Sequence, residues 1–280
     1  MAGPIPGDPY PAPGPLRAGG VVGLMWEISR EPGRHIAIPG TLNFRDAGGY
    51  PVTGGGVTGW RRLLRSDGLH RLGREATDLL GGLGLRTVVD LRTYAEAEIA
   101  PSPLEDFAGN GALTMNISLI GDDLGEMPAD LAAIYNYVVD RRGAAIAAAI
   151  RSLARPGALP GLVHCTAGKD RTGIVVAFAL AAVGVPDHFI AADYALSSLY
   201  LDPQHTPTIG RVQASTGLGD RLTSALLASP PELMLHLLDR ARRQAGSIAD
   251  YLAGYGVTCA ELIALRSALV TGSEELDEGD

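Results

Sequence analysis

The chain has 280 residues, of which 46% are hydrophobic and 5% aromatic, and its formal net charge is −8. This length suffices for one large domain with an aliphatic core. The negative charge argues against a basic nucleic-acid-binding surface, and no apolar run reaches the ~18 residues that a membrane span needs. Two cysteines without a CxxC motif indicate neither a disulfide framework nor a zinc site. We therefore expect a cytoplasmic protein that binds no nucleic acid and does not insert stably into membranes.

Both ends of the chain have compositions that are typical of disorder. Residues 1–20 are rich in proline and glycine, which do not build a packed core, and we predict that residues 1–24 are disordered. Met25 would also serve as a native start. At the other end, the last seven residues contain five acids, so residues 271–280 are predicted to be a solvated tail. A single domain is expected over residues 25–270.

Strands and helices alternate along this domain. The predicted strands lie within residues 60–65, 85–93, 112–117 and 159–165. The predicted helices lie within residues 74–84, 129–155 with an interruption at Gly143, 172–184, 186–200 and, after Pro230, three further pieces. The helix over residues 172–184 is apolar nearly all round and should lie in the core. This alternation predicts an α/β fold with layers of helices on a mainly parallel sheet.

The segment VHCTAGKDRTG lies between a predicted buried strand and the apolar helix. A loop in this position turns its backbone N–H groups toward one small volume, and the helix behind it adds the positive end of its dipole. The backbone of Thr166, Ala167 and Gly168 would line this volume. Gly168 lets the chain wrap without interference from a side chain. The sequence therefore predicts an anion-binding cradle that holds the phosphoryl group of a substrate.

Cys165 opens this loop and Arg171 closes it, in a C-x5-R arrangement. A thiol in such a cradle is expected to ionise and to act as a nucleophile. Arg171 can bind two oxygens of a phosphoryl group through its planar fork, and the Thr172 hydroxyl is placed to donate to the sulfur and ease its departure. A buried, inert cysteine is the alternative, but the complete loop sequence argues against it.

Lys169 is the single lysine among the 23 basic residues, and it lies in this loop. Lysine is a compact point charge with rotatable donors. A second cation in the loop suits a substrate with extra negative charge, such as a doubly phosphorylated or inositol-type ligand. The alternative is an arbitrary lysine in a genome that favours arginine.

The string HCTAGKDRTG resembles the signature of the cysteine-dependent protein tyrosine phosphatases, in particular the bacterial tyrosine/lipid phosphatases. Further blocks resemble this family in its order: NFRDAGGY at Asn43–Tyr50, LLRSDGLHRL at Leu63–Leu72, VVDLRT at Val88–Thr93, DYALSS at Asp193–Ser198 and GSIADYL at Gly246–Leu252. The resemblance covers about residues 40–270. It implies a three-layer fold with a mainly parallel central sheet flanked by helices, and a C-terminal helical lid over about residues 200–255. The alternative for these last helices is that they complete the core.

The resemblance also implies the reaction. Cys165 attacks phosphorus while an acid protonates the leaving oxygen, and water then hydrolyses the phosphocysteine, with no metal and no organic cofactor. The partner would be a phosphorylated protein or a phosphoinositide, and a monomer is favoured. No WPD sequence supplies the acid. Asp170 is our first choice and Asp90 the second, with Asp122 or Asp123 as further candidates.

Arg45 and Asp46 lie in a glycine-rich turn. The family block favours the hypothesis that they support the phosphate-binding loop from below, and direct contact of Arg45 with the substrate is the alternative. Two other functions compete with the phosphatase hypothesis. A phosphate-binding module without turnover would keep the cradle but lose the nucleophile, the arginine or the acid. A rhodanese-like sulfurtransferase also cradles a cysteine, but its loop lacks the lysine–aspartate–arginine–threonine run.

Overall fold

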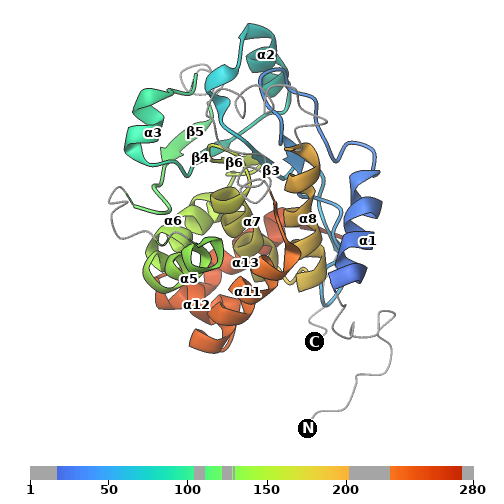
Figure 1. Cartoon of the computed structure of the whole chain (residues 1–280), viewed down its shortest axis with the longest axis vertical. Helices are drawn as coiled ribbons and strands as arrows, with labels where there is room; N and C mark the ends of the chain where they lie inside the picture. Colours follow the sequence, from blue (N-terminus) through green and yellow to red (C-terminus); the bar gives the residue numbers. More distant parts are fainter. Residues whose placement is uncertain (1–17, 104–110, 122–127, 129, 202–227, 273–280) are drawn as a thin grey trace, which may run out of the picture.

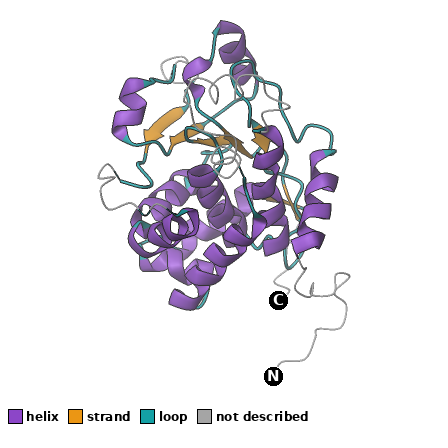
Figure 2. Cartoon of the chain, in the orientation of Figure 1, coloured by secondary structure: helices purple, strands orange, loops and turns teal. Residues whose placement is uncertain are grey.

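Five short strands form the central sheet in a computed structural model, which describes residues 18–103, 111–121, 128, 130–201 and 228–272 (Figures 1 and 2). In sheet order they are β1 (Arg45–Asp46), β3 (Leu63–Ser66), β6 (Gly161–His164), β4 (Thr87–Asp90) and β5 (Leu113–Asn116). β1 runs antiparallel to β3, and the other neighbours are parallel. The predicted mainly parallel sheet is confirmed.

The register of the parallel strands brings three strand ends to one edge of the sheet. Ser66 at the end of β3 pairs with His164 at the end of β6, and His164 pairs with Asp90 at the end of β4. Ligands of open α/β sheets bind beyond the carboxyl ends of the strands. The segment VHCTAGKDRTG leaves the sheet at this edge, so the fold places it where a site is expected.

Side chains of the central strands alternate between two cores, as the period of two in a strand requires. Leu63, Val163 and Val89 belong to the larger core, which the helices of one face complete. Their neighbours Leu64, Leu162 and Val88 belong to a smaller core on the other face. The three central strands are buried on both sides, which explains their continuous apolar sequences.

Helices cover both faces of the sheet. On the upper side in Figure 1 lie α2 (Arg74–Gly82) and α3 (Tyr94–Ile99), with the short 3-10 helix η1 (Leu69–Arg71) between β3 and α2. The larger layer contains α5 (Leu131–Arg141), α6 (Gly143–Ala154), α7 (Asp170–Ala182), α8 (Asp187–Tyr200), α11 (Pro231–Ala245), α12 (Ile248–Gly254) and α13 (Cys259–Leu269). The predicted break at Gly143 is confirmed, because α6 begins there. Residues 172–180 of α7 are all buried, as predicted for this apolar helix. None of the described helices is long and apolar enough to cross a membrane.

The structure corrects the predicted ends of the domain. Residues 18–24 are not disordered, because helix α1 spans Ala18–Ser29 and packs against α8. Val21, Met25 and Ile28 are buried in the larger core, and their spacing of four and three residues is that of one helix face. The proline- and glycine-rich composition hid this pattern. Residues 1–17 lie outside the described residues.

The acidic tail also begins later than predicted. Strand β7 (Val270–Thr271) pairs with β2 (Val57–Thr58) in a separate two-stranded sheet. Thr271 therefore belongs to the folded domain. The acids of residues 274–280 lie outside the described residues.

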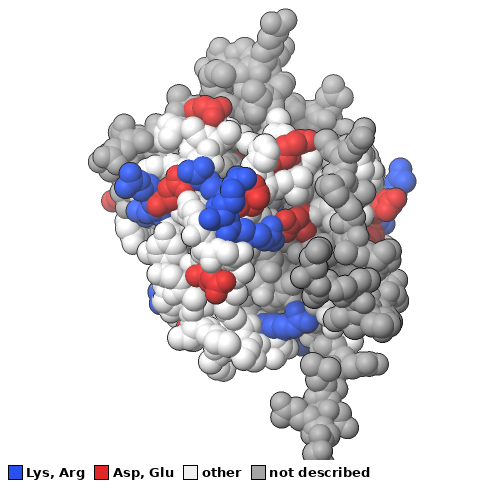
Figure 3. Space-filling view, turned by 90° about the horizontal axis from the view of Figure 1, so that it is seen from below, with Lys and Arg blue, Asp and Glu red and all other residues white. Residues whose placement is uncertain are grey.

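The predicted lid region of residues 200–255 is described only in part, since residues 202–227 lie outside the described residues. Its helices α11 and α12 pack into the larger core through residues such as Met234 and Leu238. Ion pairs join α11 to its neighbours: Arg240 binds Asp140 of α5 and Arg242 binds Asp187 of α8. Figure 3 shows that basic and acidic side chains lie next to one another on the face seen from below. The described helices of this region pack into the core, and a lid over about residues 200–255 stays a prediction.

Candidate active site

The loop of residues 165–169 connects the end of β6 to the first turn of α7. Cys165 is the first residue after the strand and is 2% exposed. Asp170 begins α7, so the loop lies at the N-terminus of a 13-residue helix. The partial positive charge of this helix end favours an anion in the loop.

Carbonyl oxygens of the loop accept hydrogen bonds from neighbouring segments. The bonds run from the Gly68 amide to Thr166 (3.0 Å), from Asn43 Nδ2 to Ala167 (3.1 Å) and Gly168 (3.0 Å), and from the Arg65 guanidinium to Gly168 (2.8 Å). The C=O and N–H of a trans peptide point in opposite directions. The amides of residues 167–169 are therefore turned away from these donors, as the predicted cradle requires.

Gly168 lies close against the end of β3. Its φ of +66° is a left-handed conformation, and a Cβ atom there would lie 2.5 Å from the backbone of Ser66 and Asp67. A glycine is needed at this position for both reasons. The sequence prediction for Gly168 agrees with this geometry.

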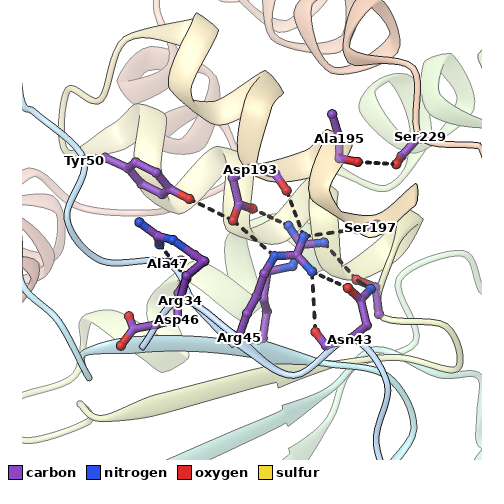
Figure 4. Close-up of polar contacts among 12 residues, drawn as sticks. Arg34, Asn43, Arg45, Asp46, Ala47, Tyr50, Asp193, Ala195, Ser197 and Ser229 are labelled. Carbon is purple, nitrogen blue, oxygen red and sulfur yellow. Dashed lines mark hydrogen bonds and ion pairs between the residues drawn. The ribbon is translucent and has the colours of Figure 1, made fainter. Parts of the chain in front are cut away.

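A buried carboxylate on α8 organises the segment below the loop (Figure 4). Asp193 accepts hydrogen bonds from Arg45 Nε (3.3 Å), Arg65 (2.5 Å) and the Tyr50 hydroxyl (3.0 Å). Burial alone would raise the pKa of Asp193, but Arg45 and Arg65 outweigh it and lower the pKa to about 2. Asp193 is therefore ionised and holds both arginines in place. In the sequence, Asp193 stands in the block DYALSS, and no role was predicted for it.

Arg45 is placed to support the loop indirectly, which is the arrangement that the sequence favoured over direct contact with the substrate. The side chain has no exposed surface. Its guanidinium also bonds the Asn43 side chain and Ser197 (3.0 Å), and Asn43 in turn binds the loop carbonyls. Asp46 holds the adjacent turn instead, through the amides of Gly48 and Arg61.

Asp90 is held in a buried ion pair and does not fit the role of general acid. Both of its oxygens accept hydrogen bonds from Arg92, at 2.6 to 3.1 Å. Burial raises the pKa of Asp90, but the Arg92 bonds outweigh this effect and leave it below the usual value. A residue that keeps its charge in a closed pair has no proton to give.

Asp170 has the access that Asp90 lacks. Its side chain is 32% exposed and is the first of α7. Its Oδ1 accepts a hydrogen bond of 2.9 Å from the Tyr135 hydroxyl, and its Oδ2 lies 3.5 Å from Lys169 Nζ. The other two candidates, Asp122 and Asp123, lie outside the described residues.

Arg171 is oriented by a residue that the sequence analysis missed. Glu96 on α3 accepts hydrogen bonds from both terminal nitrogens of Arg171 (2.5 and 2.8 Å) and from the Thr166 hydroxyl (2.7 Å). Burial raises the pKa of Glu96, but these bonds lower it to about 2. Thr93 and Glu96 also form the capping box of α3. The T-x-x-E spacing of a capping box, directly after a strand, was the signal that would have revealed both the helix and this residue.

Lys169 and Thr172 are both buried, so neither is an open substrate contact in this structure. Lys169 is 2% exposed, and its Nζ donates to the carbonyl of Ala228 (2.9 Å). The Thr172 hydroxyl has no hydrogen-bond partner within the described part of the chain. The bond from Thr172 to the cysteine sulfur therefore stays a prediction.

A cysteine at a strand end, a loop of inward amides, an arginine six residues further on and a buried helix define the class of cysteine-dependent phosphatases. Residues 36–271 match the tyrosine phosphatase family model, and the chain belongs to this family. The chain is 31% identical to a protein of Cupriavidus necator named as a tyrosine-protein phosphatase, over 85% of this chain and 90% of the relative. It is also similar to a tyrosine-protein phosphatase of Nostoc commune (32% identity, 57% of each chain).

A third relative is the triple specificity protein phosphatase PtpB of Mycobacterium tuberculosis, with 28% identity over 83% of this chain and 98% of that protein. The protein is therefore a protein tyrosine phosphatase that acts on a phosphorylated substrate, as the sequence predicted. Family membership argues against the phosphate-binding module and the sulfurtransferase.

Replacing Gly168 by alanine should impair catalysis by distorting the loop. We expect kcat/KM for p-nitrophenyl phosphate to fall about 10²-fold, because displacement of a reacting group by an ångström has this effect. Gly84→Ala is the matched control, since Gly84 has a φ of +64° and its Cβ would meet nothing within 4 Å. Gly84→Ala therefore has the same left-handed backbone strain as Gly168→Ala, but its Cβ atom does not clash with a neighbouring segment. Wild-type kcat/KM for Gly168→Ala would contradict the prediction.

Replacing Asp193 by asparagine should destabilise the protein by about 3–5 kcal/mol, because two buried arginines lose their counter-charge. Asp187→Asn on the same helix removes a half-exposed pair and should cost about 1 kcal/mol or less. Urea unfolding at neutral pH measures both.

The pH dependence tests the cause of this difference. Asp193 has a pKa of about 2 in the fold and about 3.9 in an unfolded chain. Its charge therefore contributes fully above pH ~4, and the contribution is lost as the pH falls toward 2. The stabilities of wild type and Asp193→Asn should converge over this interval. Equal stabilities of wild type and Asp193→Asn at pH 7 would show that the Asp193 carboxylate does not stabilise the buried arginines.

Proposed function

We propose that Cys165 is the nucleophile, Arg171 binds the phosphoryl oxygens and Asp170 is the general acid. The loop geometry supports the first role, since Cys165 lies where the inward amides and the N-terminus of α7 meet. Glu96 supports the second, because it occupies one side of the guanidinium and fixes its plane. The partial exposure of Asp170 supports the third.

In the first step the Cys165 thiolate attacks phosphorus. An S–P bond forms while the bond from phosphorus to the leaving oxygen breaks, and Asp170 gives its proton to that oxygen. The backbone amides of the loop and Arg171 bind the three remaining phosphoryl oxygens, where negative charge is concentrated in the transition state.

In the second step water attacks the phosphocysteine. An O–P bond forms, the S–P bond breaks, and the Asp170 carboxylate takes the proton of the attacking water. The cysteine leaves as a thiolate, inorganic phosphate is released, and Asp170 is again protonated for the next turnover. The nucleophile must stay reduced, and both Cys165 and Cys259 are free thiols. A reducing compartment such as the cytoplasm suits this chemistry.

We further infer that the substrate range extends beyond phosphotyrosine to phosphoinositides. Lys169 supports this extension, because it adds a cation to the loop next to Arg171. The name of the Mycobacterium tuberculosis relative, a triple specificity phosphatase, favours a broad range as well. Lys169 donates to Ala228 in this structure, so contact with a second phosphate requires it to exchange that carbonyl for the ligand.

Trapping the intermediate tests the proposed nucleophile. Wild-type protein that is mixed with p-nitrophenyl phosphate and quenched in acid should carry one phosphoryl group on the peptide that contains Cys165, detected by mass spectrometry. Cys165→Ser should show no turnover and no such adduct. Cys259→Ser removes an exposed cysteine and should keep both the turnover and the phosphorylated Cys165 peptide. A phosphorylated peptide elsewhere, or turnover by Cys165→Ser, would overturn the assignment.

A substrate panel tests the role of Lys169. We expect Lys169→Met to lower kcat/KM about tenfold more for a phosphoinositide than for a phosphotyrosine peptide, because the extra phosphate loses a charged partner. Lys169→Arg keeps the charge and should keep most of the preference. Loss of the bond from Lys169 to Ala228 affects both substrates alike. The ratio of the two kcat/KM values therefore reports on contact between Lys169 and the substrate. An unchanged ratio in Lys169→Met would refute this role.

A further inference from the structure

Two buried tyrosines contact the side chain that we propose as the general acid. Tyr135 comes from α5 and Tyr194 from α8, next to Asp193 in sequence. Tyr135 Oη lies 2.9 Å from Asp170 Oδ1 and 2.8 Å from Tyr194 Oη. Both rings are almost fully buried and meet edge to face, with centroids 6.1 Å apart. Neither residue lies in the C-x5-R segment.

The number of protons on the two hydroxyls determines which group donates and which accepts each hydrogen bond. A hydroxyl carries one proton, and Asp170 Oδ1 is an acceptor both in the carboxylate and in a carboxylic acid whose proton is on Oδ2. Tyr135 therefore donates to Asp170, and Tyr194 donates to Tyr135. Burial raises the pKa of both tyrosines well above the usual value, with a further rise from the Asp170 charge. Both hydroxyls thus stay protonated and remain donors.

The surroundings leave the tyrosines little freedom to move. A Cβ atom at Gly173, in the first turn of α7, would lie 2.9 Å from Cδ2 of Tyr194. The ring of Tyr194 is therefore packed directly against the helix that carries Asp170. Tyr135 is covered in the larger core. The two rings form a rigid support on one side of the carboxyl group.

We propose that Tyr135, held by Tyr194, is a positioning residue for acid catalysis by Asp170. The bond to Oδ1 fixes the rotation of the carboxyl group and leaves Oδ2 to carry the transferable proton. The same bond strengthens as negative charge develops on Asp170 during proton transfer, so it stabilises the transition state more than the ground state. Lys169, with Nζ at 3.5 Å from Oδ2, faces the carboxylate that results. The inference rests on the proposed role of Asp170.

A purely structural role for Tyr135 would produce a different pattern. Loss of the hydroxyl would then lower stability or the active fraction, and all substrates would be affected equally. Loss of acid positioning should affect phenyl phosphate, whose leaving group needs a proton, far more than p-nitrophenyl phosphate, whose leaving group departs as an anion. The ratio of the two kcat/KM values on one preparation does not depend on the folded fraction.

The experiment measures this ratio for wild type, Tyr135→Phe, Tyr194→Phe, Asp170→Asn and the double variant Asp170→Asn/Tyr135→Phe. We expect Tyr135→Phe to lower kcat/KM for phenyl phosphate about tenfold, the size of a hydrogen bond to a charged group, with less than a twofold change for p-nitrophenyl phosphate. Tyr194→Phe should shift the ratio in the same direction by less. Tyr251→Phe is the matched control, since its buried hydroxyl donates to the Val139 carbonyl (2.7 Å) instead, and it should leave the ratio unchanged.

The double variant tests whether Tyr135 acts through Asp170. If it does, Tyr135→Phe should add no further change in the ratio once Asp170 is asparagine. An unchanged ratio in Tyr135→Phe, beside a raised sensitivity to the leaving group in Asp170→Asn, would overturn the positioning role and leave the acid assignment intact. An unchanged ratio in Asp170→Asn would overturn the acid assignment and the inference with it. Additive effects in the double variant would also overturn the inference.

Discussion

The ion pairs of Asp193 with Arg45 and Arg65 are the constraint on which the active-site loop depends. All three side chains are buried, and burying a charge is unfavourable unless it is paired and hydrogen-bonded. Each arginine also bonds the loop or the segment that holds it: Arg65 donates to the Gly168 carbonyl, and Arg45 donates to Asn43. The shape of the anion cradle thus follows from charges that the substrate never contacts.

The family motif explains the chemistry only together with side chains from distant parts of the chain. Glu96 orients Arg171 from α3, and Tyr135 contacts Asp170 from α5. Neither could be found from spacing around Cys165, because each reaches the loop through tertiary packing. The loop itself supplies backbone amides and reactive groups, and the surrounding helices fix the directions in which these groups point.

The sequence predicted strands β3 to β6, the break at Gly143 and the buried helix after the loop, because apolar periodicity and glycine act locally. It failed where composition masked the pattern, as in α1, whose Val21 is buried despite the prolines before it. It could not reveal that Arg45 is paired with Asp193, or that the candidate acid Asp90 is paired with Arg92, with all of these side chains buried. Burial and pairing of a charge are properties of the tertiary fold.

Helix α8 carries Asp193 and Tyr194 as adjacent residues, and these two support different parts of the site. One holds the arginines beneath the nucleophile's loop, and the other supports the hydroxyl that contacts Asp170. Ser198, one turn further along, bonds Ser229, which follows the carbonyl held by Lys169. A small rotation or slide of this helix would therefore misalign cradle and proton donor together. Helices α1 and α11 both pack against α8, so loosening that packing would disturb the cradle and the proposed proton donor at the same time.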